Sequence, residues 1–184
     1  MFTMPSHDVT LFAEWNNGSI IGDIGPANGV VFYDKGFYSD GWRYIEAAPK
    51  DTEWLQKLWG GYGIKAESND KVIGSGKSNT EKIVSKYGDN EPFQGINDYA
   101  AKLCSDLEYG GYDDWFLPSI TELEQMIFIR SKNFYYGSYY WSSSETSENS
   151  VWCFAFATNE TKVGAKNDFH LEGVSINIRA ARIF

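Results

Sequence analysis

The sequence predicts an α+β fold, because strand-like segments lie at both ends of the chain and helical patterns lie in the middle. Apolar residues make up 42% of the 184 residues and aromatic residues 17%, beside 18 glycines. Aromatic side chains pack well on pleated sheets and glycine suits turns, so this composition favours short strands over a helix bundle. A chain of this length can bury the core of one domain.

Near the N-terminus, two alternating segments indicate strands over 28–33 and 42–47. We expect them to form a hairpin that turns through Asp34-Lys35-Gly36. Residues 51–59 follow without a clear strand pattern, and we expect a short helix there.

Three helices are expected in the middle of the chain. Ser78-Asn-Thr-Glu81 and Ser119-Ile-Thr-Glu122 both fit the capping box, in which a serine and a glutamate satisfy free backbone N–H groups at a helix start. They predict helices over about 79–87 and 120–131. Between them lies an apolar stripe at helical spacing that ends at Gly110-Gly111, formed by Tyr99, Ala100, Leu103, Cys104 and Leu107.

The C-terminal part of the chain is strand-like. The expected strands cover Tyr139–Ser142, Val151–Ala157, Thr161–Ala165 and Val174–Ala180. In the last of these, apolar residues alternate with Ser175, Asn177 and Arg179, which predicts one buried face.

Charge and residue usage exclude several function classes. A formal net charge of −9 argues against phosphate backbones, anionic lipid and sulfated glycans, so no nucleic-acid partner is expected. Two cysteines and two histidines do not suit a disulfide framework or a Cys/His zinc site, and we expect neither metal nor cofactor. No apolar run is long enough to cross a bilayer. The start of the chain lacks a signal-peptide pattern, and we expect a fragment of a longer precursor.

Three sequence patterns suggest chemistry but have simpler explanations. Gly76-Lys77-Ser78 resembles the end of a phosphate-binding loop, but Lys71 stands where that motif needs glycine. Paired carboxylates at 113–114 and at 122 and 124 are explained by turns and helix caps. His170 has no catalytic partner nearby in the sequence, so we expect at most a contact role. No enzymatic activity is predicted.

A series of ordered motifs resembles a known family. The motifs are Gly22–Gly36, Gly41-Trp-Arg-Tyr-Ile-Glu-Ala-Ala48, Ile73–Thr80, Gly110-Gly-Tyr-Asp-Asp-Trp-Phe-Leu-Pro-Ser119, Glu122-Leu123, Tyr140-Trp-Ser-Ser-Ser-Glu145 and Ile178-Arg-Ala-Ala-Arg-Ile-Phe184. They are similar to the domain found at the C-terminus of the Legionella collagen-like protein and to the Fibrobacter major-paralogue domain. The resemblance covers residues 20–184. Asp8–Trp15 resembles the closing strand of a Listeria–Bacteroides repeat, so residues 1–17 are expected to be the tail of a preceding repeat or a linker.

The resemblance implies a C-type-lectin-like fold of the formylglycine-generating-enzyme branch, with paired N- and C-terminal strands, about three helices and an irregular ligand face. The chain is most similar to variable proteins of diversity-generating retroelements, particularly the treponemal kind. Their template adenines are mutated, so that asparagine codons become other residues on a fixed scaffold. This implies a surface-displayed, receptor-like or adhesin-like binding protein whose variable region spans about 139–184.

The variable face is expected to consist of side chains that such a codon change can produce. An AAC codon randomised at its first two bases cannot encode Lys, Glu, Gln, Trp or Met, so Trp152, Glu160, Lys162 and Lys166 would be fixed. Phe154 and Phe156 are expected inside, with the alternating residues outside. The candidate ligand-binding residues are Thr146, Ser147, Asn149, Cys153, Ala155, Ala157, Thr158, Asn167, Asp168, Phe169, His170 and Leu171, bordered by exposed Tyr139 and Tyr140 from the fixed scaffold.

Two other functions stay open. One is an invariant carbohydrate-binding adhesin domain, although the calcium-lectin motifs are missing. The other is a relative of the formylglycine-generating oxidase, which would need Cys104 and Cys153 as a close pair. In the main hypothesis the partner is a protein or another macromolecule, and the protein lies at the cell surface or outside the cell. Membrane association would come only through a lipid anchor or a segment outside this chain.

Overall fold

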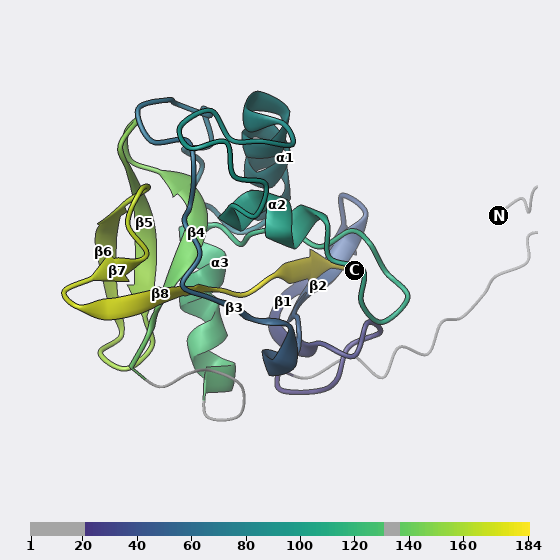
Figure 1. Cartoon of the computed structure of the whole chain (residues 1–184). Helices are drawn as coiled ribbons and strands as arrows, with labels where there is room; N and C mark the ends of the chain where they lie inside the picture. The colour runs from purple at the N-terminus through teal and green to yellow at the C-terminus, as the bar shows by residue number, and fades with distance from the viewer. Residues whose placement is uncertain (1–20, 131–136) are drawn as a thin grey trace, which may run out of the picture.

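The computed structural model describes residues 21–130 and 137–184, and within them the chain has a mixed α+β architecture (Figure 1). A small antiparallel sheet joins both ends of this region in the order β1-β2-β9. Its strands are β1 (Val30–Ser39), β2 (Trp42–Ala47) and β9 (Ala181–Ile183). Ile45 pairs with Ile183, so the chain end lies beside the N-terminal hairpin. The predicted pairing of N- and C-terminal strands is therefore confirmed.

The larger sheet has the strand order β3-β8-β4-β5-β6, and β7 pairs with β8. Its strands are β3 (Trp54–Leu55), β4 (Tyr139–Glu145), β5 (Ser150–Ala155), β6 (Glu160–Ala165), β7 (His170–Leu171) and β8 (Val174–Ile178). Strands β4 and β8 run parallel, and the other neighbours are antiparallel. The predicted strand over 161–165 is confirmed.

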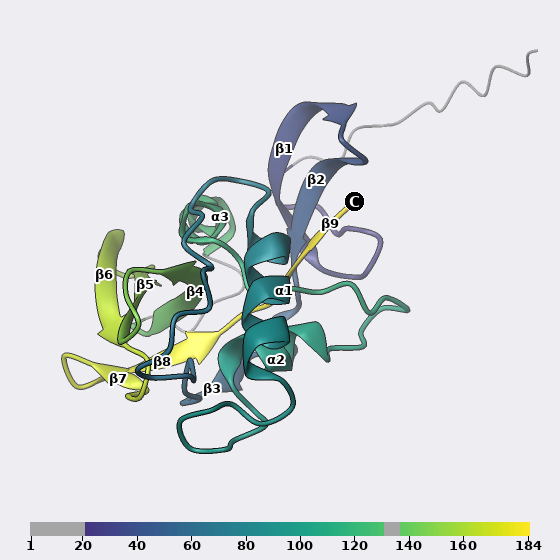
Figure 2. The ribbon, with the colours of Figure 1, turned by 90° about the horizontal axis from the view of Figure 1, so that it is seen from above.

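Helices cover both faces of the larger sheet (Figure 2). Helices α1 (Gly76–Tyr87) and α2 (Ala100–Ser105) pack on one face, where they share a core with Trp141 and Cys153. On the other face, α3 (Ile120–Gln125) and the 3-10 turn η2 (Met126–Ile129) fill the space between this sheet and the small one. No helix in the described part of the chain is long and apolar enough to span a membrane.

Two expectations for the N-terminal half are wrong. The hairpin turns at Asp40-Gly41 rather than at 34–36, and both residues have positive φ, as a two-residue type I′ turn requires. Residues 51–59 do not form a helix. A 3-10 turn, η1 (Lys50–Thr52), leads directly into β3, where Trp54 pairs with Ile178 of β8. Pairing with a strand far along the chain overrides the weak local preference.

Only one of the two predicted capping boxes forms. Ser119 and Glu122 cap α3 as expected. Helix α1 begins at Gly76, before Ser78, and the N-cap Ser75 makes no side-chain cap bond. Instead, the Gly74 and Gly76 N–H groups donate to the carboxylate of Glu122, so this carboxylate serves the starts of two helices.

The close packing at the start of α1 requires glycine at position 76. A Cβ at Gly76 would lie 2.2 Å from Glu122 Oε2, so the glycine is needed for this close approach. Burial raises the pKa of Glu122 to about 6, although its backbone donors oppose that rise.

Helix α2 ends at Ser105, and Gly110-Gly111 form a separate turn between the paired residues Tyr109 and Tyr112 instead of ending the helix.

In the C-terminal part, burial on two faces replaces simple alternation. Phe154 and Phe156 are buried as predicted. Asn177 and Arg179 are also buried, so the expectation of a single buried face over 174–180 is wrong. Arg179 can be buried because it pairs with the equally buried Glu53 at 2.6 Å.

Candidate ligand-binding surface

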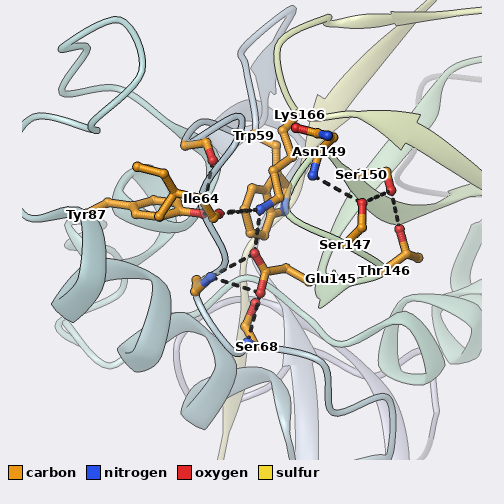
Figure 3. Close-up of polar contacts among 12 residues, drawn as sticks. Trp59, Ile64, Ser68, Tyr87, Glu145, Thr146, Ser147, Asn149, Ser150 and Lys166 are labelled. Atoms are coloured by element: carbon orange, nitrogen blue, oxygen red, sulfur yellow. Dashed lines mark hydrogen bonds and ion pairs between the residues drawn. The ribbon is translucent and has the colours of Figure 1, made fainter.

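A buried ion pair anchors the predicted variable region. Lys166 follows β6, Glu145 ends β4, and both side chains are almost completely buried. Lys166 Nζ lies 2.5 Å from Glu145 Oε1, 2.9 Å from the Ile64 carbonyl oxygen and 3.3 Å from the Tyr87 hydroxyl (Figure 3). Its ammonium also lies 4.6 Å from the centre of the Trp59 ring. Burial lowers the pKa of Lys166, while the bond to Glu145 opposes that change.

Glu145 extends this anchor to the loop before α1. Its carboxylate accepts hydrogen bonds from the backbone N–H groups of Ala66 and Ser68. The Glu145 N–H in turn donates to the Ser68 carbonyl. Strand β4, the loop near 64–68 and the segment after β6 are therefore held together by one buried charge pair.

The β4–β5 turn lies directly beside this anchor. Ser150 Oγ lies 2.5 Å from Thr146 Oγ1 and 2.7 Å from Ser147 Oγ, and Ser147 Oγ accepts from the Asn149 N–H (Figure 3). The Lys166 N–H donates to the Asn149 carbonyl. Thr146 is exposed, and Ser147 and Asn149 are half-buried. The anchor thus fixes the backbone of this turn while its side chains reach the surface.

The segment after Lys166 brings further candidates to the surface. Asn167 and Asp168 are exposed. The Asp168 N–H donates to the Ala165 carbonyl, and its carboxylate accepts from the His170 N–H. Phe169 and His170 are half-buried, with ring centres 4.5 Å apart.

The β7–β8 hairpin lies over part of the larger sheet. Leu171 of β7 is half-buried and packs against the core that contains Cys153 and Ala155. Tyr139 donates from its hydroxyl to Glu172 at the hairpin turn, and Lys162 of β6 lies 3.8 Å from the same carboxylate. The hairpin is therefore tied to both β4 and β6.

Four expected surface residues are buried, and those predictions are wrong. Cys153 and Ala155 point into the core shared with α1 and α2, because the larger sheet is covered on both faces. Tyr139 and Tyr140 are buried as well, and their hydroxyls donate to Glu172 and Glu53. A strand buried on both faces cannot present its alternate residues to a ligand.

The remaining candidates divide between two ends of the sheet. The 146–149 turn and the 167–168 segment lie together, as the Lys166–Asn149 bond shows. Ala157, half-buried, and Thr158, exposed, follow the other end of β5. Six strand residues span about 20 Å, so these two groups lie at opposite ends of β5, and the half-buried Phe169, His170 and Leu171 follow Asp168 along the chain. We call the surface formed by Thr146, Ser147, Asn149, Asn167 and Asp168 the anchored surface.

Several residues of this region escaped the sequence analysis. Glu145 was noted only as part of a motif, and Lys166 only as a residue outside the codon set. In the strand Tyr140-Trp-Ser-Ser-Ser-Glu145, the glutamate is the single charged residue, and this position at the end of an uncharged strand is the signal for a buried partner such as Lys166. No sequence signal indicated Tyr87 or Trp59 as its neighbours.

The two cysteines do not form a reactive pair. Cys104 and Cys153 are both buried and free of a disulfide. Burial raises the pKa of Cys104 well above its usual range and that of Cys153 to about 12, so neither favours the thiolate that such chemistry needs. Within residues 21–130 and 137–184, no three His, Cys, Asp or Glu side chains gather as metal ligands would.

No protein-family model matches the chain, and no curated protein matches it.

Proposed function

We propose that this protein is a surface-displayed binding module with a C-type-lectin-like fold, in which a retroelement diversifies exposed side chains of the C-terminal region. Its partner is a protein or another macromolecule outside the cell. The paired β2 and β9, together with helices packed around the central strands, support the lectin-like assignment.

The observation that carries the proposal is the separation between backbone anchoring and side-chain exposure. The 146–149 turn and the segment after β6 are fixed by Lys166 and Glu145, which are buried. Thr146, Asn167 and Asp168 are exposed, and Thr146 and Asp168 bond to neighbours within their own turns. Their side chains can change while the loop geometry persists, which is the property that a display scaffold needs.

The residues that a randomised AAC codon can encode fall on the exposed side of this division. Lys166 and Glu145 are residues that a randomised AAC codon cannot encode, and they form the buried anchor. All five residues of the anchored surface belong to the set that this codon can encode. The agreement supports a fixed framework beside variable positions.

Deep sequencing of this locus from a single bacterial population tests the proposal. We expect substitutions concentrated at the codons of the anchored surface and no substitution at Glu145 or Lys166. The codons for Lys77 and Glu81 in α1 serve as an internal control, because they are exposed but lie outside the variable region. Equal substitution rates in α1 and in the anchored surface, or no variation at all, would show that the module is not diversified.

A further inference from the structure

Strand β6 forms one outer edge of the larger sheet (Figure 1, Figure 2). It pairs with β5 over Glu160–Ala165, and no other strand within residues 21–130 and 137–184 pairs with it. An open strand edge can accept another strand, so proteins usually protect such edges with charges, proline or bulges. Strand β6 contains no proline, and its register with β5 is regular from end to end.

Alternate backbone groups of β6 point away from the sheet. The N–H of Lys166, which follows β6, donates to the Asn149 carbonyl in the same register as the β5–β6 ladder. In an antiparallel strand, backbone bonds to one neighbour recur at every second residue, so the even-numbered residues of β6 turn these groups toward β5. The residues whose backbone groups face outward are therefore Thr161, Val163 and Ala165.

The side chains on one face of this edge are apolar at its centre. Val163 is 45% exposed and pairs with the half-buried Trp152 of β5. Thr161 and Ala165 share this face, where the Thr161 hydroxyl donates to Glu124 of α3. An exposed valine in the middle of an edge strand is the opposite of the usual protection.

The lysine of β6 does not guard this edge. Lys162 Nζ lies 3.3 Å from the Glu160 carboxylate and 3.8 Å from that of Glu172 in the β7–β8 hairpin. Its side chain lies on the opposite face of the sheet from Val163, because the two residues are neighbours on one strand. The charge is therefore balanced within the chain.

We propose that β6 pairs antiparallel with β6 of a second copy of this chain, about a twofold axis through Val163. Val163 then lies opposite its own counterpart and exchanges both backbone bonds with it. The Ala165 N–H donates to the Thr161 carbonyl of the second copy. Trp152 and Val163 of the two copies form one apolar row across the interface.

The edge fits a second copy because its charges and side chains are complementary to themselves in this register. Lys162 lies opposite Gly164 of the second copy, so no like charges meet. A register centred on Lys162 would instead oppose two lysines, which is unfavourable. Pairing of a single short strand buries less area than a standard protein interface, so the dimer is weak and reversible.

The dimer has a consequence that rests on the proposed function. Antiparallel pairing places the start of one β6 against the end of the other, so the β5–β6 turn of each copy lies beside residues 167–168 of its counterpart. Ala157 and Thr158 would thereby join the anchored surface of the second copy, although β5 separates these groups within one chain. A dimer without sequence variation at this locus would support the pairing and overturn only this joint variable surface.

Cysteine cross-linking of the full chain tests the register. The Cα atoms of Val163 and its counterpart would lie about 5.5 Å apart, which a disulfide can span. Val163→Cys should therefore form a disulfide-linked dimer under mild oxidation in dilute solution. Ala165→Cys is the matched control, because this exposed residue lies on the same face but would be about 14 Å from its counterpart. The native Cys104 and Cys153 are buried and do not compete. No cross-linking of Val163→Cys, or equal cross-linking of both variants, would overturn the register.

Sedimentation velocity measures the reversible dimer of the unmodified chain. We expect the dimer fraction to rise with concentration. Val163→Lys brings two like charges to the axis and should weaken the dimer at least tenfold, whereas Ser85→Lys adds the same charge on the exposed face of α1 and should leave it unchanged. A chain that stays monomeric at its highest soluble concentration, or a dimer that Val163→Lys does not weaken, would refute pairing through β6.

Discussion

Replacement of Lys166 by methionine tests the buried anchor most directly. The substitution keeps most of the side-chain volume but removes the charge that faces Glu145 at 2.5 Å. Glu145 would keep its bonds from the Ala66 and Ser68 N–H groups but would become a buried carboxylate without a counter-ion. Removal of one partner from a buried pair costs about 3–5 kcal/mol. For a chain of this size, each kcal/mol lowers Tm by about 2–4 °C, so we expect a fall of about 6–20 °C.

Differential scanning calorimetry at neutral pH measures this effect. Lys162→Met is the matched control, because Lys162 forms ion pairs with Glu160 and Glu172 at the surface. Its Tm should change little. The double variant Lys166→Met with Glu145→Gln should be more stable than Lys166→Met alone, because glutamine removes the unpaired charge and its oxygen can still accept backbone bonds. A Tm for Lys166→Met equal to that of the Lys162→Met control would refute this reasoning.

Three further predictions concern stability. Burial raises the pKa of Glu122 in the folded state from its usual value of 4.5 to about 6, so protonation of Glu122 favours the folded state. Its contribution of about 2 kcal/mol should be lost as pH rises from 4.5 to 6. Urea unfolding of Glu122→Gln across this range should lack that decrease, and a parallel profile in both proteins would contradict it. Ser119→Ala should lower the free energy of unfolding by about 1 kcal/mol and Ser78→Ala by much less, because Ser119 caps its helix and Ser78 does not. Equal losses of the two variants in urea titrations would disprove this. Deletion of residues 179–184 removes β9 and should abolish cooperative melting, so an unchanged calorimetric transition would show that β9 is dispensable.

The sequence predicts elements well where local signals and long-range packing agree. The capping box at Ser119 and the strand over 161–165 depend on local patterns, and both are found in the structure. The helix expected over 51–59 is absent because Trp54 pairs with β8, a contact more than 120 residues away in the sequence. The type I′ turn at Asp40-Gly41 was missed although Asp-Gly is a strong local signal for it.

The candidate site was less predictable for a related reason. Alternation along a strand shows which residues share a face, but it does not show whether both faces are covered. Cys153 and Ala155 were therefore placed at the surface, whereas α1, α2 and the β7–β8 hairpin enclose their face of the sheet. Lys166 posed the opposite difficulty, because a lysine is rarely buried unless a partner is present, and Glu145 lies 21 residues earlier.

Buried ion pairs would allow the C-terminal region to keep a fixed backbone if it is diversified as we propose. Lys166 pairs with Glu145, Arg179 with Glu53 and Arg182 with Glu46, so each basic residue is held by an earlier carboxylate. A randomised AAC codon can encode arginine but not lysine, so constancy at Arg179 cannot come from the codon set alone. It would require either a codon without template adenines or selection for the ion pair. Sequencing of the template repeat beside the expressed copies separates these causes: template adenines at the codon for Arg179 together with arginine in every expressed copy indicate selection, and folded variants that replace Arg179 would show that this pair does not fix the end of the chain.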